Sequence, residues 1–202
     1  MFMEKDETLA VERVDEVVRA ETVKGPWKLS FPKGWRCPES IPLESLRSWT
    51  EIPDGEVRYF SGIATYETEV KAGGDGGRVI LDLGEVKNVA EVTVNGKTYP
   101  ALWRPPFKVD VTDALTKGGQ TLSLRIRVAN LWPNRLIGDA KLPEDCEWGE
   151  DCVSLKRIPD WVQSGKPSPT GRLTFTTWKH WSKDAPLLES GLLGPVKLEI
   201  VR

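Results

Sequence analysis

Residues 177 to 181 read TWKHW and place the single histidine of the chain, His180, between Lys179 and Trp181, with Trp178 close by. A histidine can transfer protons near neutral pH, and an indole presents a wide apolar face with one N–H donor. The stretch therefore has three interpretations. It is an active site, a ligand-binding surface, or a pair of core tryptophans with a histidine between them.

Catalysis by His180 would require a nucleophile and an orienting acid within reach. Ser182 and Asp184 are close in sequence, but the chain has no GxSxG motif to present a serine. The acids between residues 144 and 151 are numerous, yet acids in loops are usually solvated and carry no catalytic role. We therefore predict no catalytic residue.

Ligand binding is the sharper hypothesis, because a second stretch combines an indole with planar polar groups. LWPNRLIGD holds one tryptophan and three polar side chains, and another tryptophan follows nine residues later. Stacking on an indole together with planar hydrogen-bonding groups suits a hydroxyl-rich ring. The predicted ligand-binding residues are Trp178, Lys179, His180, Trp132, Asn134, Arg135, Asp139 and Trp148.

The same polar residues have a structural alternative. Arg135 and Asp139 are four residues apart and could pair along one helical turn. In that case NLWPNRLIGD would tether the following loop to the rest of the fold, since most buried polar groups satisfy hydrogen bonds within the protein. Both interpretations stay open.

Metal and disulfide chemistry receive weak support. Three cysteines and one histidine provide no zinc ligand set and no CxxC motif. A structural calcium ion held by Asp139, Glu144 and Asp145 is conceivable, but no DxDxDG pattern is present, so we assign no metal and no cofactor. Cys146 and Cys152 could form a disulfide that leaves Cys37 free, or all three could be free thiols.

The composition excludes two classes of partner. The 202 residues include 28 Lys and Arg against 30 Asp and Glu, so no net field would attract nucleic acid or an anionic membrane. No apolar run approaches the length of a membrane span. The first ten residues, MFMEKDETLA, lack the layout of a signal peptide. The sequence leaves the localisation undetermined.

An alternation of apolar and polar residues with period two predicts strands from residue 57 onward. The glycine-rich links are short, and Asn95–Gly96 suits a two-residue hairpin turn with positive φ at both positions. Because no long amphipathic helix separates the strands, the pattern favours an antiparallel, all-β, two-layer sandwich. Six strands are expected within FSGIATYETEV, RVILDLGE, EVTVNG, FKVDVT, TLSLRIRVAN and the segment from Val196 to Ile200.

One domain is expected, because 202 residues suffice for one core. We assign residues 1–24 to a lead-in segment and residues 25–202 to a single sandwich domain. Alternation disappears in residues 131–171, which we predict to be one long, ordered loop packed over an edge of the sandwich, because tryptophans argue against disorder. Core packing is predicted for Trp27, Trp35, Trp49 and Trp103.

Three stretches together resemble a known family. They are YFSGIATYETEV, the run from LDLGEVKNVAEVTVNG through W-R-PPF-KVDVT to NLWPNRLIGD, and TFTTWKHWSKDAPLLESGLLGPVKL. Together they resemble the jelly-roll, galactose-binding-like β-sandwich that accompanies the catalytic module in family 2-type glycoside hydrolases. The two narrower motifs, NLWPNRLIGD and TFTTWKHW, are most similar to the C-terminal part of the α-L-rhamnosidases of family 106.

The resemblance implies a non-catalytic, carbohydrate-associated domain, which would bind a polysaccharide or brace the catalytic cleft of a parent hydrolase. The expected partners are a carbohydrate and the catalytic module of that parent, which would act in the periplasm or outside the cell. In such hydrolases the catalytic carboxylates belong to a separate barrel. Two alternatives are a purely structural scaffold between domains and a small glycosidase in its own right.

Overall fold

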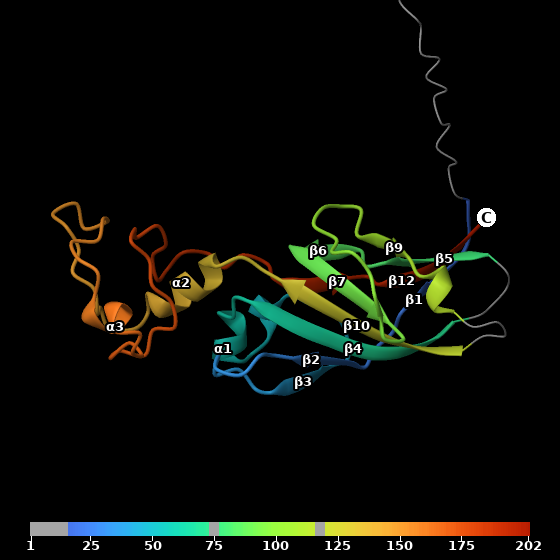
Figure 1. The fold of residues 1–202 in the computed structure, drawn as a ribbon, viewed down its shortest axis with the longest axis horizontal. Helices are drawn as coiled ribbons and strands as arrows, with labels where there is room; N and C mark the ends of the chain where they lie inside the picture. The colour runs from blue at the N-terminus through green and yellow to red at the C-terminus, as the bar shows by residue number, and fades with distance from the viewer. Residues whose placement is uncertain (1–15, 73–76, 116–119) are drawn as a thin grey trace, which may run out of the picture.

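The computed structural model describes residues 16–72, 77–115 and 120–202. Figure 1 shows an elongated molecule with a β-sandwich at one end and a smaller lobe that carries α2 and α3 at the other. In chain order the elements are β1 (Val17–Thr22), β2 (Trp27–Ser30), β3 (Ser40–Leu43), η1 (Trp49–Glu51), α1 (Gly55–Arg58), β4 (Ile63–Ala72), β5 (Arg78–Asp82), β6 (Glu85–Lys87), β7 (Val89–Val94), β8 (Lys97–Thr98), β9 (Lys108–Asp110), η2 (Thr112–Ala114), β10 (Gln120–Ala129), α2 (Pro133–Asp139), α3 (Asp160–Gln163), β11 (Gly191–Gly194) and β12 (Lys197–Val201).

Two antiparallel sheets form the sandwich. One has six strands in the order β3-β2-β4-β10-β7-β8, and the other has four in the order β1-β12-β5-β9. A short pair, β11 and β6, is also antiparallel. The six predicted strands correspond to β4, β5, β7, β9, β10 and β12. The predicted all-β sandwich is therefore confirmed.

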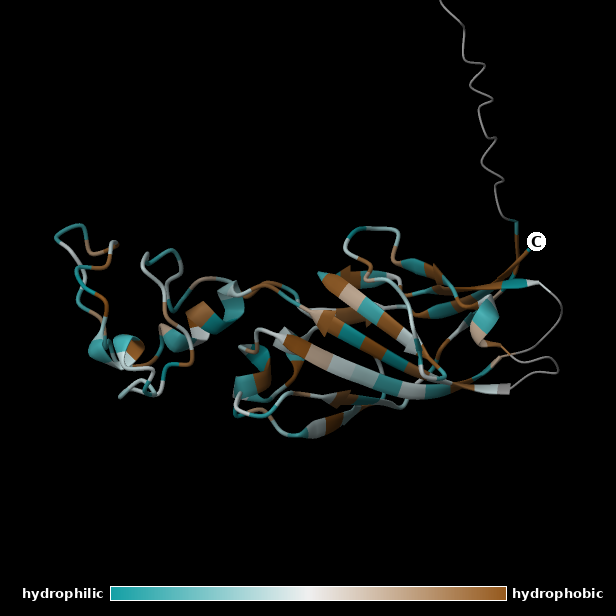
Figure 2. Cartoon of the chain, in the orientation of Figure 1, coloured by the Kyte–Doolittle hydropathy of each residue, from teal (hydrophilic) through white to brown (hydrophobic). Residues whose placement is uncertain are grey.

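The core lies between the sheets and follows the predicted alternation. In β10, Leu122, Leu124, Ile126 and Val128 are buried, while the residues between them face solvent. Figure 2 shows the resulting alternation of hydrophobic and hydrophilic residues along the strands. The predicted turn at Asn95–Gly96 has φ values of 49° and 83°, as a hairpin with positive φ at both positions requires.

Tryptophans form part of the core. Trp27 and Trp49 are buried as predicted, and Trp35 is half-buried against Phe60 at a centroid distance of 5.4 Å. The prediction for Trp103 is wrong, because its side chain is 71% exposed. It follows the isolated bridge between Ala90 and Leu102, and Leu102 packs against the core in its place.

The first described residues belong to the sheet. β1, which lies within the predicted lead-in of residues 1–24, pairs with β12 from Val17 to Thr22. Residues 1–15 lie outside the described part of the chain, as do residues 73–76 and 116–119. The sandwich thus begins at least eight residues earlier than the predicted boundary at residue 25.

Residues 131–190 form the terminal lobe. The sequence predicts a loop at residues 131–171 that packs over an edge of the sandwich, but Figure 1 shows this segment projecting beyond the end of the sandwich, together with the returning residues 172–190. Within the lobe, half-buried Trp161 packs edge-on against half-buried Phe175 at a centroid distance of 6.1 Å. None of the described helices is long and apolar enough to cross a bilayer.

A buried hydrogen-bond network fixes the root of the lobe. The Asn130 amide donates to the carbonyl of Phe60 and to Ser190 Oγ, at 2.9 and 3.1 Å. The Asn134 amide donates to the carbonyl of Leu188 at 2.7 Å and accepts from the Leu188 N–H at 2.8 Å. Because these bonds join Asn130 to the residue Phe60 and to the returning chain, and α2 to the returning chain, the root of the lobe is fixed in position.

Candidate functional site

The TWKHW stretch is held by backbone hydrogen bonds within the lobe. The Leu155 N–H donates to the carbonyl of Thr177 at 3.0 Å, and the Lys179 N–H donates to the carbonyl of Val153 at 2.9 Å. The neighbouring hairpin is closed by the Gly149 N–H, which donates to the carbonyl of Ser154 at 2.8 Å. Residues 147–149, 153–156 and 177–179 therefore form a small three-stranded ladder.

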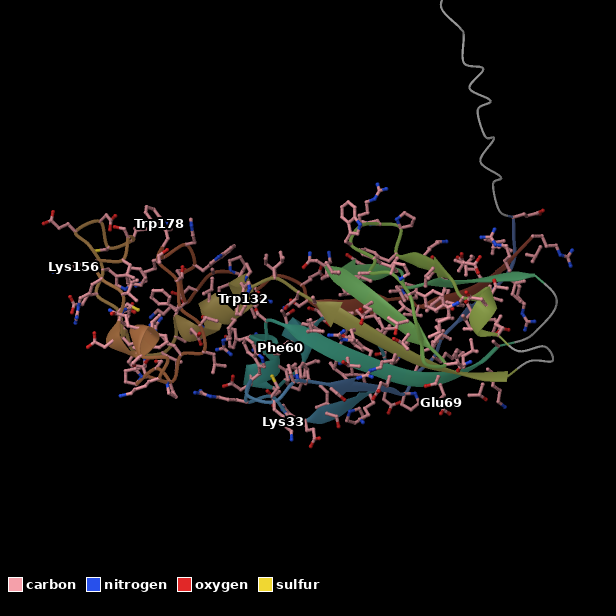
Figure 3. All side chains as sticks on the ribbon, in the orientation of Figure 1. Lys33, Phe60, Glu69, Trp132, Lys156 and Trp178 are labelled. Atoms are coloured by element: carbon pink, nitrogen blue, oxygen red, sulfur yellow. The ribbon has the colours of Figure 1, made fainter. Side chains whose placement is uncertain are left out.

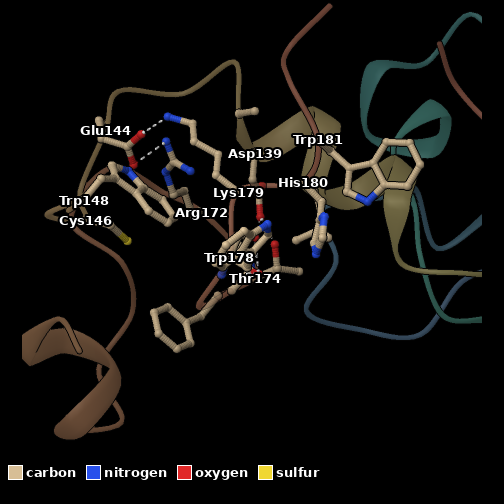
Figure 4. Close-up of a pocket in the computed structure, with 14 residues that line it drawn as sticks. Asp139, Glu144, Cys146, Trp148, Arg172, Thr174, Trp178, Lys179, His180 and Trp181 are labelled. Carbon is tan, nitrogen blue, oxygen red and sulfur yellow. Dashed lines mark hydrogen bonds and ion pairs between the residues drawn. The ribbon is translucent and has the colours of Figure 1, made fainter. Parts of the chain in front are cut away.

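A pocket lies between this ladder and α2. Its walls come from Leu136 and Asp139 of α2, from Ala140 just after the helix, and from the segments 144–148 and 172–181. Figure 4 shows the labelled side chains converging from these segments. The cavity holds about 50 Å³, which is room for a few waters but less than a sugar ring. A larger ligand would have to lie across its mouth.

The mouth of the pocket carries an exposed indole. Trp178 is 46% exposed, and its ring lies 5.9 Å from that of His180 with a tilt of 43°. Trp181 is half-buried and also lines the pocket. Figure 3 shows Trp178 in the outer part of the lobe, whereas Trp132 lies at its root. Trp178 and His180 therefore face solvent together.

One wall of the pocket is an ion-pair cluster around Glu144. Its carboxylate lies 2.9 Å from the Lys179 ammonium and 3.2 Å from the Arg172 guanidinium. Lys179 also lies over the Trp148 ring, 5.1 Å from its centroid. Partial burial acts to raise the pKa of Glu144, but the contacts with Lys179 and Trp148 and the charge of Arg172 outweigh burial, so the pKa is lowered.

The indole N–H of Trp148 is a buried donor that finds no partner in hydrogen-bonding geometry within the described part of the chain. Its effect on the nearby carboxylate is therefore electrostatic rather than that of a full hydrogen bond. Among the described residues that line the pocket, Trp178 presents an exposed indole whose ring also contacts that of His180.

Arg172 holds the loop before the hairpin in place. Its guanidinium donates to the carbonyls of Leu142 and Pro143, each at 3.2 Å, and lies 3.2 Å from the Asp145 carboxylate. The Arg172 side chain is 12% exposed and the Asp145 side chain 1% exposed. No pattern in the sequence singled out Arg172, because its partners are about thirty residues away.

Asp139 joins the two walls. One carboxylate oxygen accepts hydrogen bonds from the N–H groups of Leu173 and Thr174, at 3.0 and 2.8 Å, and from the Thr174 hydroxyl at 2.6 Å. The other oxygen lies 3.0 Å from the Arg135 guanidinium, the i,i+4 pairing that the sequence allowed. The acid lines the pocket, but its oxygens are directed at protein donors.

The eight predicted ligand-binding residues divide into two groups. Trp178, Lys179, His180, Trp148 and Asp139 line one pocket. The other three lie outside its lining: Asn134 and Arg135 are buried at the root of the lobe, and Trp132 is 56% exposed with its ring against Trp35 at 6.0 Å. Asn134 bonds to Leu188 and Arg135 pairs with Asp139, which are the contacts expected if NLWPNRLIGD tethers the following loop to the rest of the fold.

The carboxylates proposed for calcium do not fit a calcium site. Asp139 accepts from three protein donors, and Glu144 is paired with two cations. Asp145 accepts from the hydroxyls of Ser168 and Thr170, at 2.5 and 3.0 Å, and lies beside an arginine. Calcium requires six to eight oxygens without adjacent cations. Asp145 and Glu144 do form an acidic cluster with Cys146.

All three thiols are unpaired. In the hairpin, Trp148 lies opposite Leu155, so the register places residue 146 opposite residue 157 and away from Cys152. Burial, followed by the hydrogen bond with Asp145, raises the pKa of Cys146 to about 11. Of the two alternatives left open by the sequence, the structure contains free thiols.

Comparisons with known proteins give a consistent picture. No family model matches the chain. A protein of Formosa agariphila with the provisional name β-glucuronidase is 39% identical over 207 residues, which span 96% of this chain and 18% of that protein. The solved structure of a rhamnosidase from Novosphingobium sp. PP1Y is 33% identical with a TM-score of 0.70, over 98% of this chain and 16% of its own.

A β-glucuronidase from an uncultured Clostridium species has a TM-score of 0.58 at 21% identity, over 92% of this chain and 29% of its own, which shows a shared fold. The chain thus spans less than a fifth of the two more similar proteins. The expected resemblance to a domain of rhamnosidase-like glycoside hydrolases is confirmed.

Proposed function

We propose that the chain is a non-catalytic, carbohydrate-binding domain of a glycoside hydrolase and that its pocket in the terminal lobe binds sugar. The observation that carries the proposal is the exposed Trp178 ring at the mouth of a pocket with polar walls. A sugar ring would stack on this indole through its C–H face. Lys179 and His180, which line the same pocket, would then lie beside its hydroxyl groups.

The absence of a catalytic role is supported by the state of the carboxylates. Glycoside hydrolysis needs a protonated carboxylic acid and a second, opposed carboxylate. The pKa of Glu144 is lowered by its cationic partners, which is the opposite of what a general acid needs. Asp139 and Asp145 are buried and already hydrogen-bonded. The pocket therefore has the groups of a binding site rather than those of a hydrolase.

Glycan binding by the isolated chain tests the proposal. A glycan array followed by calorimetry would use rhamnose-containing and other plant and bacterial polysaccharides at up to millimolar concentration. We expect Trp178→Ala to weaken binding at least about fivefold, because stacking on an aromatic ring contributes about 1 kcal/mol or more and each 1.4 kcal/mol is a factor of ten in affinity. Trp132→Ala is the matched control, since that indole is equally exposed but lies outside the pocket.

Two results would contradict the proposal. The first is that no glycan of the set binds the folded wild-type chain. The second is that Trp178→Ala and Trp132→Ala weaken binding equally. A circular dichroism spectrum of each variant establishes that the fold is intact. Turnover of p-nitrophenyl rhamnoside by the wild-type chain, lost on replacement of one carboxylate, would instead show a small glycosidase.

A further inference from the structure

The outer face of the six-stranded sheet is polar along the strands and becomes apolar next to the lobe. The register places residues of β4, β10 and β7 in rows across its outer surface. Two successive rows are Thr65–Arg127–Glu91 and Glu67–Arg125–Thr93, which are polar and linked by ion pairs such as Arg127–Glu91 at 2.7 Å. This is the usual composition of a sheet face in water.

The row nearest the lobe is apolar. It consists of Ile63, Ala129 and Val89, and Ile63 and Val89 are 44% and 36% exposed. Figure 2 shows hydrophobic residues at these ends of β4, β7 and β10. Leu131 continues the same strand direction two residues beyond Ala129 and is 52% exposed.

A groove of about 380 Å³ adjoins this row. Leu131, Leu187 and Leu188 form its apolar wall, and Leu188 is 38% exposed. Lys87 and Glu189 lie at its rim, 3.3 Å apart, and Asn88 connects the groove to Val89. We call the set Ile63, Val89, Leu131 and Leu188 the junction patch. An apolar centre with a polar rim is the anatomy of a protein interface.

We infer that the junction patch docks onto the remaining part of a glycoside hydrolase, with an apolar side chain of that partner in the groove beside Leu131 and Leu188. The inference rests on the proposed function. In the Novosphingobium rhamnosidase the matching region is 16% of a single polypeptide, so the larger part of that chain is tethered beside it. Tethering gives a high effective concentration, at which a modest apolar patch suffices for docking.

Two other occupants fit the patch less well. A sugar would need an aromatic ring for stacking, and the four residues of the junction patch include none. A second copy of the chain would meet the same small patch at much lower effective concentration. Both occupants give distinct outcomes in the test below.

Cysteine labelling distinguishes the occupants. Leu131→Cys and Leu188→Cys are made in the isolated chain, with Ile158→Cys as the matched control, because Ile158 is an aliphatic residue of the lobe with 47% exposure outside the patch. The same replacements are made at the aligned positions of the intact Novosphingobium rhamnosidase. Labelling by a maleimide at each site is followed by peptide mass spectrometry.

We expect all three sites to label rapidly in the isolated chain. In the intact rhamnosidase the two patch sites should label at least about tenfold more slowly than in the isolated chain, with the control site unchanged. Equal labelling in the two proteins would overturn the inference, and so would protection in the isolated chain that grows with its concentration, which indicates a second copy. Protection by added glycan would show a sugar site instead.

Failure of this inference is separable from failure of the proposed function. The isolated Leu131→Cys chain should bind glycan as the wild type does, because Leu131 lies outside the pocket lining. Weaker glycan binding by Trp178→Ala, combined with fast labelling in the intact hydrolase, would support the sugar site and contradict the docking surface.

Discussion

Asp139 is the residue on which the pocket depends most, and replacing it by alanine tests that dependence. The substitution removes the acceptor of two backbone N–H groups, those of Leu173 and Thr174, and leaves the Arg135 guanidinium buried with 6% of its side chain exposed. Each unpaired buried donor costs about 1–3 kcal/mol, and breaking a buried ion pair costs about 3–5 kcal/mol. Because these costs overlap, we expect about 3–5 kcal/mol of destabilisation.

Replacing the arginine should cost less. Arg135→Met leaves Asp139 with three hydrogen bonds from neutral donors, so the carboxylate is not stranded. The second partner of the arginine, Glu56, lies at 3.2 Å with 38% exposure, and water replaces that contact. We therefore expect about 1–3 kcal/mol. Exposed Arg127, paired with Glu91, is the matched control, and Arg127→Met should cost less than about 1 kcal/mol.

The assay is urea unfolding at pH 7, followed by tryptophan fluorescence. We expect an order as well as magnitudes: Asp139→Ala is the most destabilising, then Arg135→Met, then Arg127→Met. If Arg135→Met lowered the unfolding free energy as much as Asp139→Ala, the ion pair rather than the backbone acceptor would hold the two walls together, and the account of the pocket would be refuted.

Three further predictions concern local contacts. Gly138→Ala should destabilise by about 1–3 kcal/mol in the same urea assay, because a Cβ there would lie 2.7 Å from a tyrosine side chain, whereas Gly55→Ala, which has open space, should not. Glu144→Gln should lower the unfolding free energy above pH 4.5, and the difference from wild type should disappear as the pH falls below that value. The reason is that a lowered pKa adds stability only while the carboxyl is ionised. A difference that persists in acid would contradict this. Iodoacetamide at pH 8 should modify exposed Cys152 before Cys37, whose pKa is raised to about 12 by burial and by nearby carboxylates, and peptide mass spectrometry would detect the reverse order.

The sandwich could be predicted because its information is local. Leu122, Leu124, Ile126 and Val128 alternate within one strand, and Asn95–Gly96 defines one turn, so short windows of sequence suffice. Trp103 shows the limit of this reasoning. Its neighbours in sequence are those of a core residue, but the bridge made by Leu102 directs that residue inward and leaves the tryptophan outside.

The lobe could be predicted only in part, because its contacts join distant segments. The presentation of Trp178 and His180 follows from their spacing. By contrast, Asp139 accepts hydrogen bonds across the pocket from the backbone N–H groups of residues 173 and 174. Backbone donors do not depend on residue type, so the sequence could not indicate them. The same holds for Arg172, whose guanidinium donates hydrogen bonds to the carbonyls of residues 142 and 143.

These long-range bonds also explain why a site can exist on a segment with little regular secondary structure. A stacking site is effective when its aromatic ring is already fixed, because ordering a free side chain on binding costs about 0.5–1.5 kcal/mol. The backbone of Trp178 is fixed by bonds of its neighbours to Val153 and Leu155, and α2 behind it is fixed by Asn134 at the root. Of the residues that the sequence offered as ligands, Asn134 and Arg135 make contacts that hold the root of the lobe in place, whereas Trp178 and His180 are the exposed residues that we propose as the sugar contacts.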